Sequence, residues 1–115
     1  MTWEQVLTFA ASLPGAERTT YYRDPATKAN GHPVVTPSRE ADSFCLHVDR
    51  DKVEILKATD PQTFWQAPHY EGWPCVLVRY ASTDPERVWA TIAQAHLDLY
   101  AQLVQPAGQQ RGVGR

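Results

Sequence analysis

Residues 43 to 49 read Ser-Phe-Cys-Leu-His-Val-Asp, with a large apolar side chain at every second position. A period of two is typical of a β-strand that turns one face to a core. The phenylalanine, leucine and valine form that face, whereas Cys45 and His47 lie on the opposite, open face. The stretch therefore predicts a half-buried strand in a sheet that is covered on one side.

Three further stretches predict the neighbouring strands. Asn30-Gly31 is the strongest hairpin signal in the chain, because both residues tolerate a positive φ. We expect strands at about 26–30 and 33–37 on either side of it. Residues 74–80 predict another clear strand, and residues 68–73 a loop or an irregular strand.

The chain is expected to begin and end in helices. Thr2 and Gln5 match a capping box, and Pro14-Gly15 ends the first helix. Asp84-Pro85 opens the longest helix, with an apolar stripe at spacings of three or four residues. The stripe consists of Val88, Ile92, Ala95, Leu99 and Leu103.

Two more helical segments are expected between the strands. Asp49 or Asp51 caps the first of them, which runs through the apolar residues at 53–56. Asp60-Pro61 restarts helical geometry, because Asp suits the cap and Pro the first turn. This second segment includes Phe64-Trp65.

The order of elements predicts an α+β fold of the type α-β(3)-α-β(2)-α. We expect a two-layer sandwich in which helices cover one face of an antiparallel sheet. Residues 1–104 form a single domain in this interpretation. Residues 105–115 lack periodicity and are expected to be a flexible tail.

Length and composition agree with one globular domain. The chain has 115 residues, of which 43% are apolar and 21% charged, close to the globular average. No stretch approaches the roughly 18 apolar residues of a spanning helix, and the N-terminus lacks a signal-peptide pattern. We therefore expect a cytoplasmic protein without a membrane partner, in which Cys45 and Cys75 are thiols.

Charge is segregated along the chain. Without Arg111 and Arg115, 9 basic groups stand against 13 acidic groups, which is unfavourable for phosphate binding. Residues 18–39, however, contain four Arg or Lys residues against Asp24 alone. A local basic region is expected there.

Two stretches resemble the MmcQ/YjbR family, and with the first and last helices the resemblance covers roughly residues 2–104. The first stretch is Leu13-Pro14-Gly15-Ala16-Glu17, followed by Tyr21, Pro25, Lys28 and Gly31. The second is Pro68-His69-Tyr70-x-Gly72-x-Pro74, leading into Val76-Leu77-Val78-Arg79. Many relatives have His-Trp-Asn where this chain has His69-Tyr70-Glu71.

The resemblance implies an α-β-β-β-α-β-β-α architecture like that of type III secretion chaperones. It also implies weak DNA binding, through a double-wing shape rather than through a chemical motif.

The basic hairpin region is the first candidate site. Its cations and aromatic rings suit contacts with phosphates and stacking on a base or sugar. They equally suit a solvated hairpin edge that discourages aggregation. The candidate residues are Arg18, Tyr21, Tyr22, Arg23, Lys28, His32 and Arg39.

The open sheet face and the loop after residue 67 form the second candidate site, for a protein or a small ligand. Such loops often hold binding residues on a rigid scaffold, although flanking aromatic residues also plug the edge of a core. The candidate residues are His47, His69, Tyr70, Trp73 and Arg79.

Neither a metal nor a cofactor is expected. Cys45, His47 and Cys75 share the open face, but they lack the short spacings of a zinc site. The Asp49 and Asp51 carboxylates suit a helix start, and no nucleophile-elbow, P-loop or dinucleotide motif occurs. The sequence predicts a non-enzymatic binding module, either monomeric or weakly homodimeric, for DNA or for a protein or small ligand.

Overall fold

The computed structural model describes residues 1–104, with side chains described as far as Leu99. A six-stranded antiparallel sheet is the centre of the fold in this part of the chain. The strands lie in the order β1-β2-β3-β4-β6-β5. Their bounds are Ala16–Tyr21 (β1), Asp24–Ala29 (β2), His32–Pro37 (β3), Ser43–His47 (β4), Phe64–Trp65 (β5) and Cys75–Arg79 (β6). The predicted tail lies outside the described residues.

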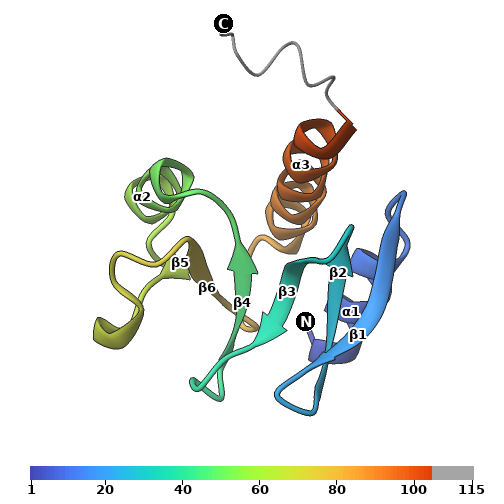
Figure 1. Ribbon diagram of the computed structural model, residues 1–115. Helices are drawn as coiled ribbons and strands as arrows, with labels where there is room; N and C mark the ends of the chain where they lie inside the picture. The colour runs from blue at the N-terminus through green and yellow to red at the C-terminus, as the bar shows by residue number, and fades with distance from the viewer. Residues whose placement is uncertain (105–115) are drawn as a thin grey trace, which may run out of the picture.

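Three helices cover one face of this sheet (Figure 1). They are α1 (Trp3–Ala11), α2 (Arg50–Thr59) and α3 (Pro85–Val104). Apolar side chains from all three helices pack on Phe44, Leu46, Val76 and Val78 of the sheet. The α+β class and the two-layer arrangement are thereby confirmed.

Local sequence signals explain where the helices begin. The Thr2 hydroxyl accepts a hydrogen bond from the backbone N–H of Gln5, whose side chain accepts one from the backbone N–H of Thr2. Asp49 accepts from the backbone N–H of Lys52 and caps α2, and Asp84 accepts from the backbone N–H of Arg87 at the start of α3. The predicted caps of all three helices are confirmed, with Asp49 rather than Asp51 capping α2.

Four strands, rather than the predicted three, lie between α1 and α2. The predicted hairpin at Asn30 and Gly31 is present, with φ of 51° and 85°. The additional strand, β1, joins β2 through Tyr22 and Arg23, which also have positive φ, at 51° and 75°. Neither residue type is typical of such a turn, so the sequence gives no signal for this hairpin.

The helical segment predicted at Asp60-Pro61 is wrong. Asp60 instead ends α2, and its carbonyl accepts hydrogen bonds from the backbone N–H groups of Thr63 and Phe64. Phe64 then pairs with Val78 as part of the short strand β5. This register buries the Phe64 side chain completely, and burial of a large aromatic ring outweighs a local capping preference.

The second face of the sheet is covered at its centre, contrary to the prediction of an open face. Residues 68–73, predicted as a loop or an irregular strand, form a loop that contains a 3-10 turn at Pro68–Tyr70. Trp65, Ala67 and Tyr70 pack over Cys45 and Leu77. The segment after β5 thus folds across β4 and β6.

No helix among the described residues is long and apolar enough to cross a membrane.

Candidate functional site

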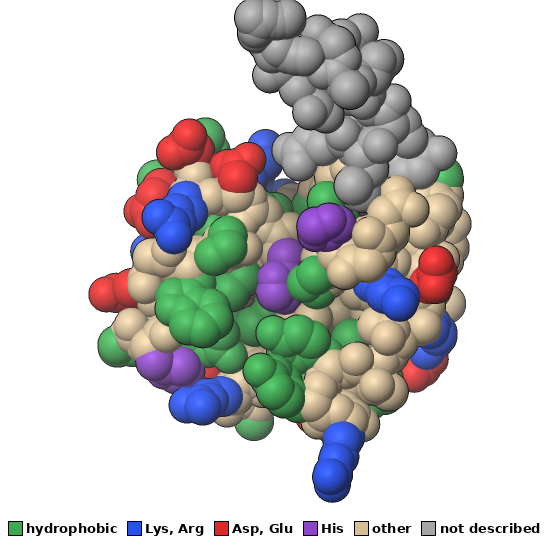
Figure 2. Space-filling view, viewed as in Figure 1, with side chains coloured by type: hydrophobic (Ala, Val, Ile, Leu, Met, Phe, Trp, Pro, Cys, Tyr) green, Lys and Arg blue, Asp and Glu red, His purple; other side chains and the backbone are tan. Residues whose placement is uncertain are grey.

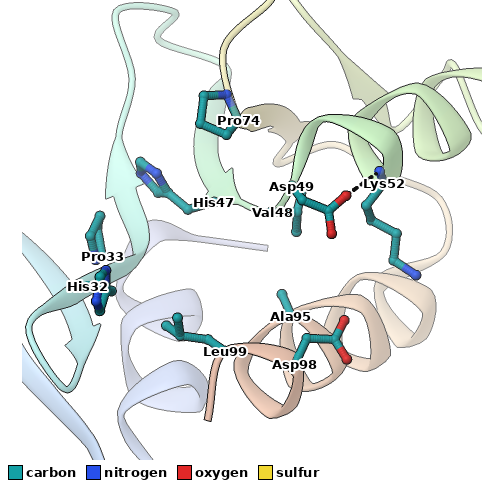
Figure 3. Close-up of a pocket in the computed structure, with 10 residues that line it drawn as sticks. All are labelled: His32, Pro33, His47, Val48, Asp49, Lys52, Pro74, Ala95, Asp98 and Leu99. Carbon is teal, nitrogen blue, oxygen red and sulfur yellow. Dashed lines mark hydrogen bonds between the residues drawn. The ribbon is translucent and has the colours of Figure 1, made fainter. Parts of the chain in front are cut away.

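A cleft of about 270 Å³ lies at the end of the sheet where β3 begins and β4 ends. Figure 2 shows histidine side chains in a hollow bordered by apolar side chains. In Figure 3, His32 and His47 lie on the sheet side, and α2 and α3 form the other walls. The polar lining is formed by His32, His47, Asp49, Lys52 and Asp98.

The topology explains why these side chains meet. β3 and β4 are antiparallel neighbours, so the first residue of β3 and the last residue of β4 lie at the same end of the sheet. The chain then passes directly into α2, which brings Lys52 to the cleft. Ala95, Asp98 and Leu99 lie three and four residues apart on one face of α3.

His47 is a neutral side chain at physiological pH. Its Nε2 lies 2.9 Å from the Thr36 hydroxyl, and the Tyr21 ring packs edge-on at a centroid distance of 6.4 Å. Burial lowers the pKa of His47 to about 4. The ring can therefore accept or donate a hydrogen bond without introducing a charge.

Opposite charges face the cleft from the two helices. Lys52 projects from α2 and Asp98 from α3 (Figure 3). Asp98 accepts a hydrogen bond of 2.8 Å from Gln94. Among the described residues, neither charge forms a salt bridge.

The cations of the hairpin region do not gather on one surface. Arg18 turns toward α1, where it forms a 3.0 Å salt bridge with Glu4. Lys28 lies directly opposite Glu17 across β1 and β2. Only Arg23, in the β1–β2 turn, and Arg39, in the loop after β3, lie at the same end of the sheet.

The aromatic residues of this region differ in exposure. Tyr22 is 87% exposed at the hairpin tip, and its ring packs edge-on against Tyr21. Tyr21 in turn contacts His47. His32 lines the cleft rather than joining a hairpin surface.

Apart from His47, the residues of the second candidate site have mainly structural contacts. The backbone N–H of Arg39 donates to the Tyr70 hydroxyl at 3.2 Å, and the His69 ring packs on Tyr70. Arg79 stacks over Trp65 and donates to the carbonyls of Pro61 and Gln62. Trp73 is 60% exposed, and the next residue, Pro74, lines the cleft.

Three important residues were missed from the sequence. Lys52 and Asp98 lie 46 positions apart, and no local pattern links them. The side-chain amide of Gln66 donates to the carbonyls of Tyr70, Trp73 and Cys75. No sequence motif predicts these hydrogen bonds. The helical spacing of Ala95, Asp98 and Leu99 was the one available signal, since it places a carboxylate beside the apolar stripe.

Among the described residues, no three His, Cys, Asp or Glu side chains lie close enough together to hold a metal ion.

No protein-family model matches the sequence, and the comparisons with curated proteins and with solved structures give no match either. Membership of the MmcQ/YjbR family therefore stays a prediction from the two sequence stretches described above.

Proposed function

We propose that this chain is a non-catalytic binding module. It holds a small zwitterionic ligand, such as a free amino acid, in the cleft lined by His32 and His47. The observation that supports the proposal is that two histidines, one lysine and two aspartates line a cavity of about 270 Å³. Ligand sites are concave, largely apolar and equipped with a few polar groups. This volume lies just below the usual range, which favours a small ligand.

The charges define the ligand chemistry. Lys52 favours a carboxylate, whereas the first turn of α2 is already capped by the Asp49 carboxylate. Asp98 favours an ammonium group. Between them, Pro33, Val48 and Leu99 offer an apolar wall for a side chain. A cytoplasmic location, where free amino acids are abundant, suits this function.

A thermal-shift and calorimetric screen with the twenty free amino acids tests the proposal. A ligand present at 100 times its Kd is expected to add about 2.7 kcal/mol to the free energy of unfolding. Lys52→Ala and Asp98→Ala should each weaken binding at least about tenfold, since each removes one charge-assisted contact.

Arg50→Ala is the matched control, because Arg50 lies in the same turn of α2 but does not line the cleft. Its affinity should equal that of the unaltered protein. Absence of binding by every amino acid at millimolar concentration would refute the proposal, as would equal losses in Arg50→Ala and Lys52→Ala.

DNA binding is the second candidate, and a specific arrangement supports it. The β1–β2 turn and the β3–β4 loop project at the same end of the sheet (Figure 1). They contain Tyr22, Arg23 and Arg39. In a double-wing arrangement, these side chains could contact the backbone of a DNA duplex. Asp24, Glu40 and Asp42 lie beside these cations, which makes this function weaker than the first.

A gel-shift titration at low salt tests DNA binding. The double variant Arg23→Ala/Arg39→Ala should reduce the log–log salt slope by about 2, because each cation neutralises about one phosphate. Arg18→Ala should leave the slope unchanged, since Arg18 faces α1. No shift at tens of micromolar protein, or an equal effect of Arg18→Ala, counts against DNA binding.

A further inference from the structure

Cys45 and Cys75 lie on neighbouring strands with their side chains on the same face. The register pairs Cys45 with Leu77 and His47 with Cys75, so the two cysteines are diagonal neighbours. Their side chains are hydrogen-bonded to each other. Both are free thiols, 3% and 4% exposed.

Three donors converge on the Cys45 sulfur. They come from Cys75 on β6, Tyr70 in the 3-10 turn and Thr36 on β3. The Thr36 hydroxyl also lies at a hydrogen-bonding distance of 2.9 Å from Nε2 of His47. A chain of hydrogen bonds thus leads from the cleft to the thiol.

This arrangement distinguishes the two thiols chemically. The hydrogen bond from Cys75 lowers the pKa of Cys45, with smaller contributions from Tyr70 and Thr36, whereas burial opposes them. The same hydrogen bond and burial raise the pKa of Cys75. Cys45 is the better nucleophile, because the thiolate is the reactive form.

We propose that Cys45 and Cys75 are a reversible dithiol–disulfide pair, in which Cys45 reacts with a peroxide and Cys75 resolves the product. The Cys45 sulfur attacks one peroxide oxygen, the O–O bond breaks, and Cys45 becomes a sulfenic acid as the peroxide is reduced to water or an alcohol. Cys75 then attacks the Cys45 sulfur and releases water. A small-molecule thiol, by exchange, restores both thiols and is itself oxidised to a disulfide.

The surroundings permit this change. Cys75 is the first residue of β6, whereas Cys45 is the central residue of β4, so closing the pair requires movement of the start of β6 toward Cys45. The covering segment is a loop with one short turn, and Gly72 within it has a φ of 85°. Burial of both sulfurs restricts the oxidant to a small molecule such as hydrogen peroxide.

Hydrogen peroxide added to the reduced, full-length protein tests the proposal. The expected product has lost two hydrogen atoms in the intact mass, and neither cysteine is alkylated after unfolding. A thiol reductant should restore both alkylation sites. In Cys75→Ser the reaction should stop at a Cys45 sulfenic acid, which dimedone traps.

Tyr70→Phe keeps the ring and removes one donor to Cys45. We expect its oxidation to be about tenfold slower, because a charge-assisted hydrogen bond to the thiolate is lost. Tyr22→Phe removes an exposed hydroxyl at the hairpin tip and should oxidise at the unaltered rate. Thermal melts of both variants separate this effect from unfolding.

The proposal is overturned if both thiols stay reduced at a peroxide concentration that oxidises free cysteine in the same tube. A disulfide that forms only between two chains, or only in denaturant, has the same consequence.

Discussion

Replacing Gln66 with leucine is expected to lower the free energy of unfolding by about 2 kcal/mol, since several hydrogen bonds worth about 1 kcal/mol each are lost together. The Gln66 amide donates to the carbonyls of Tyr70, Trp73 and Cys75 at 3.1, 3.3 and 2.8 Å, and its oxygen accepts from the Lys57 ammonium at 3.0 Å. One side chain therefore holds the segment that covers Cys45 and Leu77.

Urea unfolding of Gln66→Leu and of Gln94→Leu measures this effect. Gln94 is an exposed glutamine on α3 with a single hydrogen bond, to Asp98, so its replacement should change stability by no more than about 0.5 kcal/mol. Equal losses in the two variants would mean that the loop does not depend on Gln66.

The second large effect is a loss of stability between pH 6.5 and pH 4, caused by His47. Its folded pKa is about 4 because of burial, whereas an unfolded histidine titrates near 6.5. In this window the unfolded chain binds a proton that the folded chain does not, so acid favours unfolding. The contribution of His47 is at most about 3 kcal/mol, fully present above pH 6.5 and lost by pH 4.

Comparison of His47→Asn with His69→Asn isolates this contribution. Asn at position 47 retains a partner for the Thr36 hydroxyl but has no proton to bind, so stability should fall less steeply from pH 7 to pH 4.5. His69 is exposed, and His69→Asn should follow the unaltered protein. Parallel curves for all three proteins would show that His47 is not the responsible group.

The fold was predictable where local signals and tertiary packing agree. The Thr2 capping box, the Asn30-Gly31 turn and the alternation in residues 43–49 each specify their element through nearest neighbours. Prediction failed at Asp60-Pro61, where a good cap motif lies next to Phe64. Burying that ring against the sheet requires a strand, and no local signal reports a long-range contact.

The candidate site was predictable only in part. His32 and His47 were assigned to two different surfaces, and the topology joins them in one cleft with Lys52 and Asp98. The proximity of these residues depends on the order of the strands and on the direction of α3. Neither can be predicted from local sequence patterns. The proximity of Cys45 and Cys75 was easier to predict, because the two-residue period of the strands places both side chains on the same face of the sheet.

The left-handed turn at Tyr22 and Arg23 influences how the sheet opens. Two such non-glycine residues cost about 1 kcal/mol each, and β1, at the edge of the sheet, contains no fully buried side chain. Its amide protons should therefore exchange with deuterated solvent sooner than those of β4. Each such opening uncovers the β2 backbone to pairing with another molecule, so the exposure of this sheet edge depends on a surface turn rather than on the core.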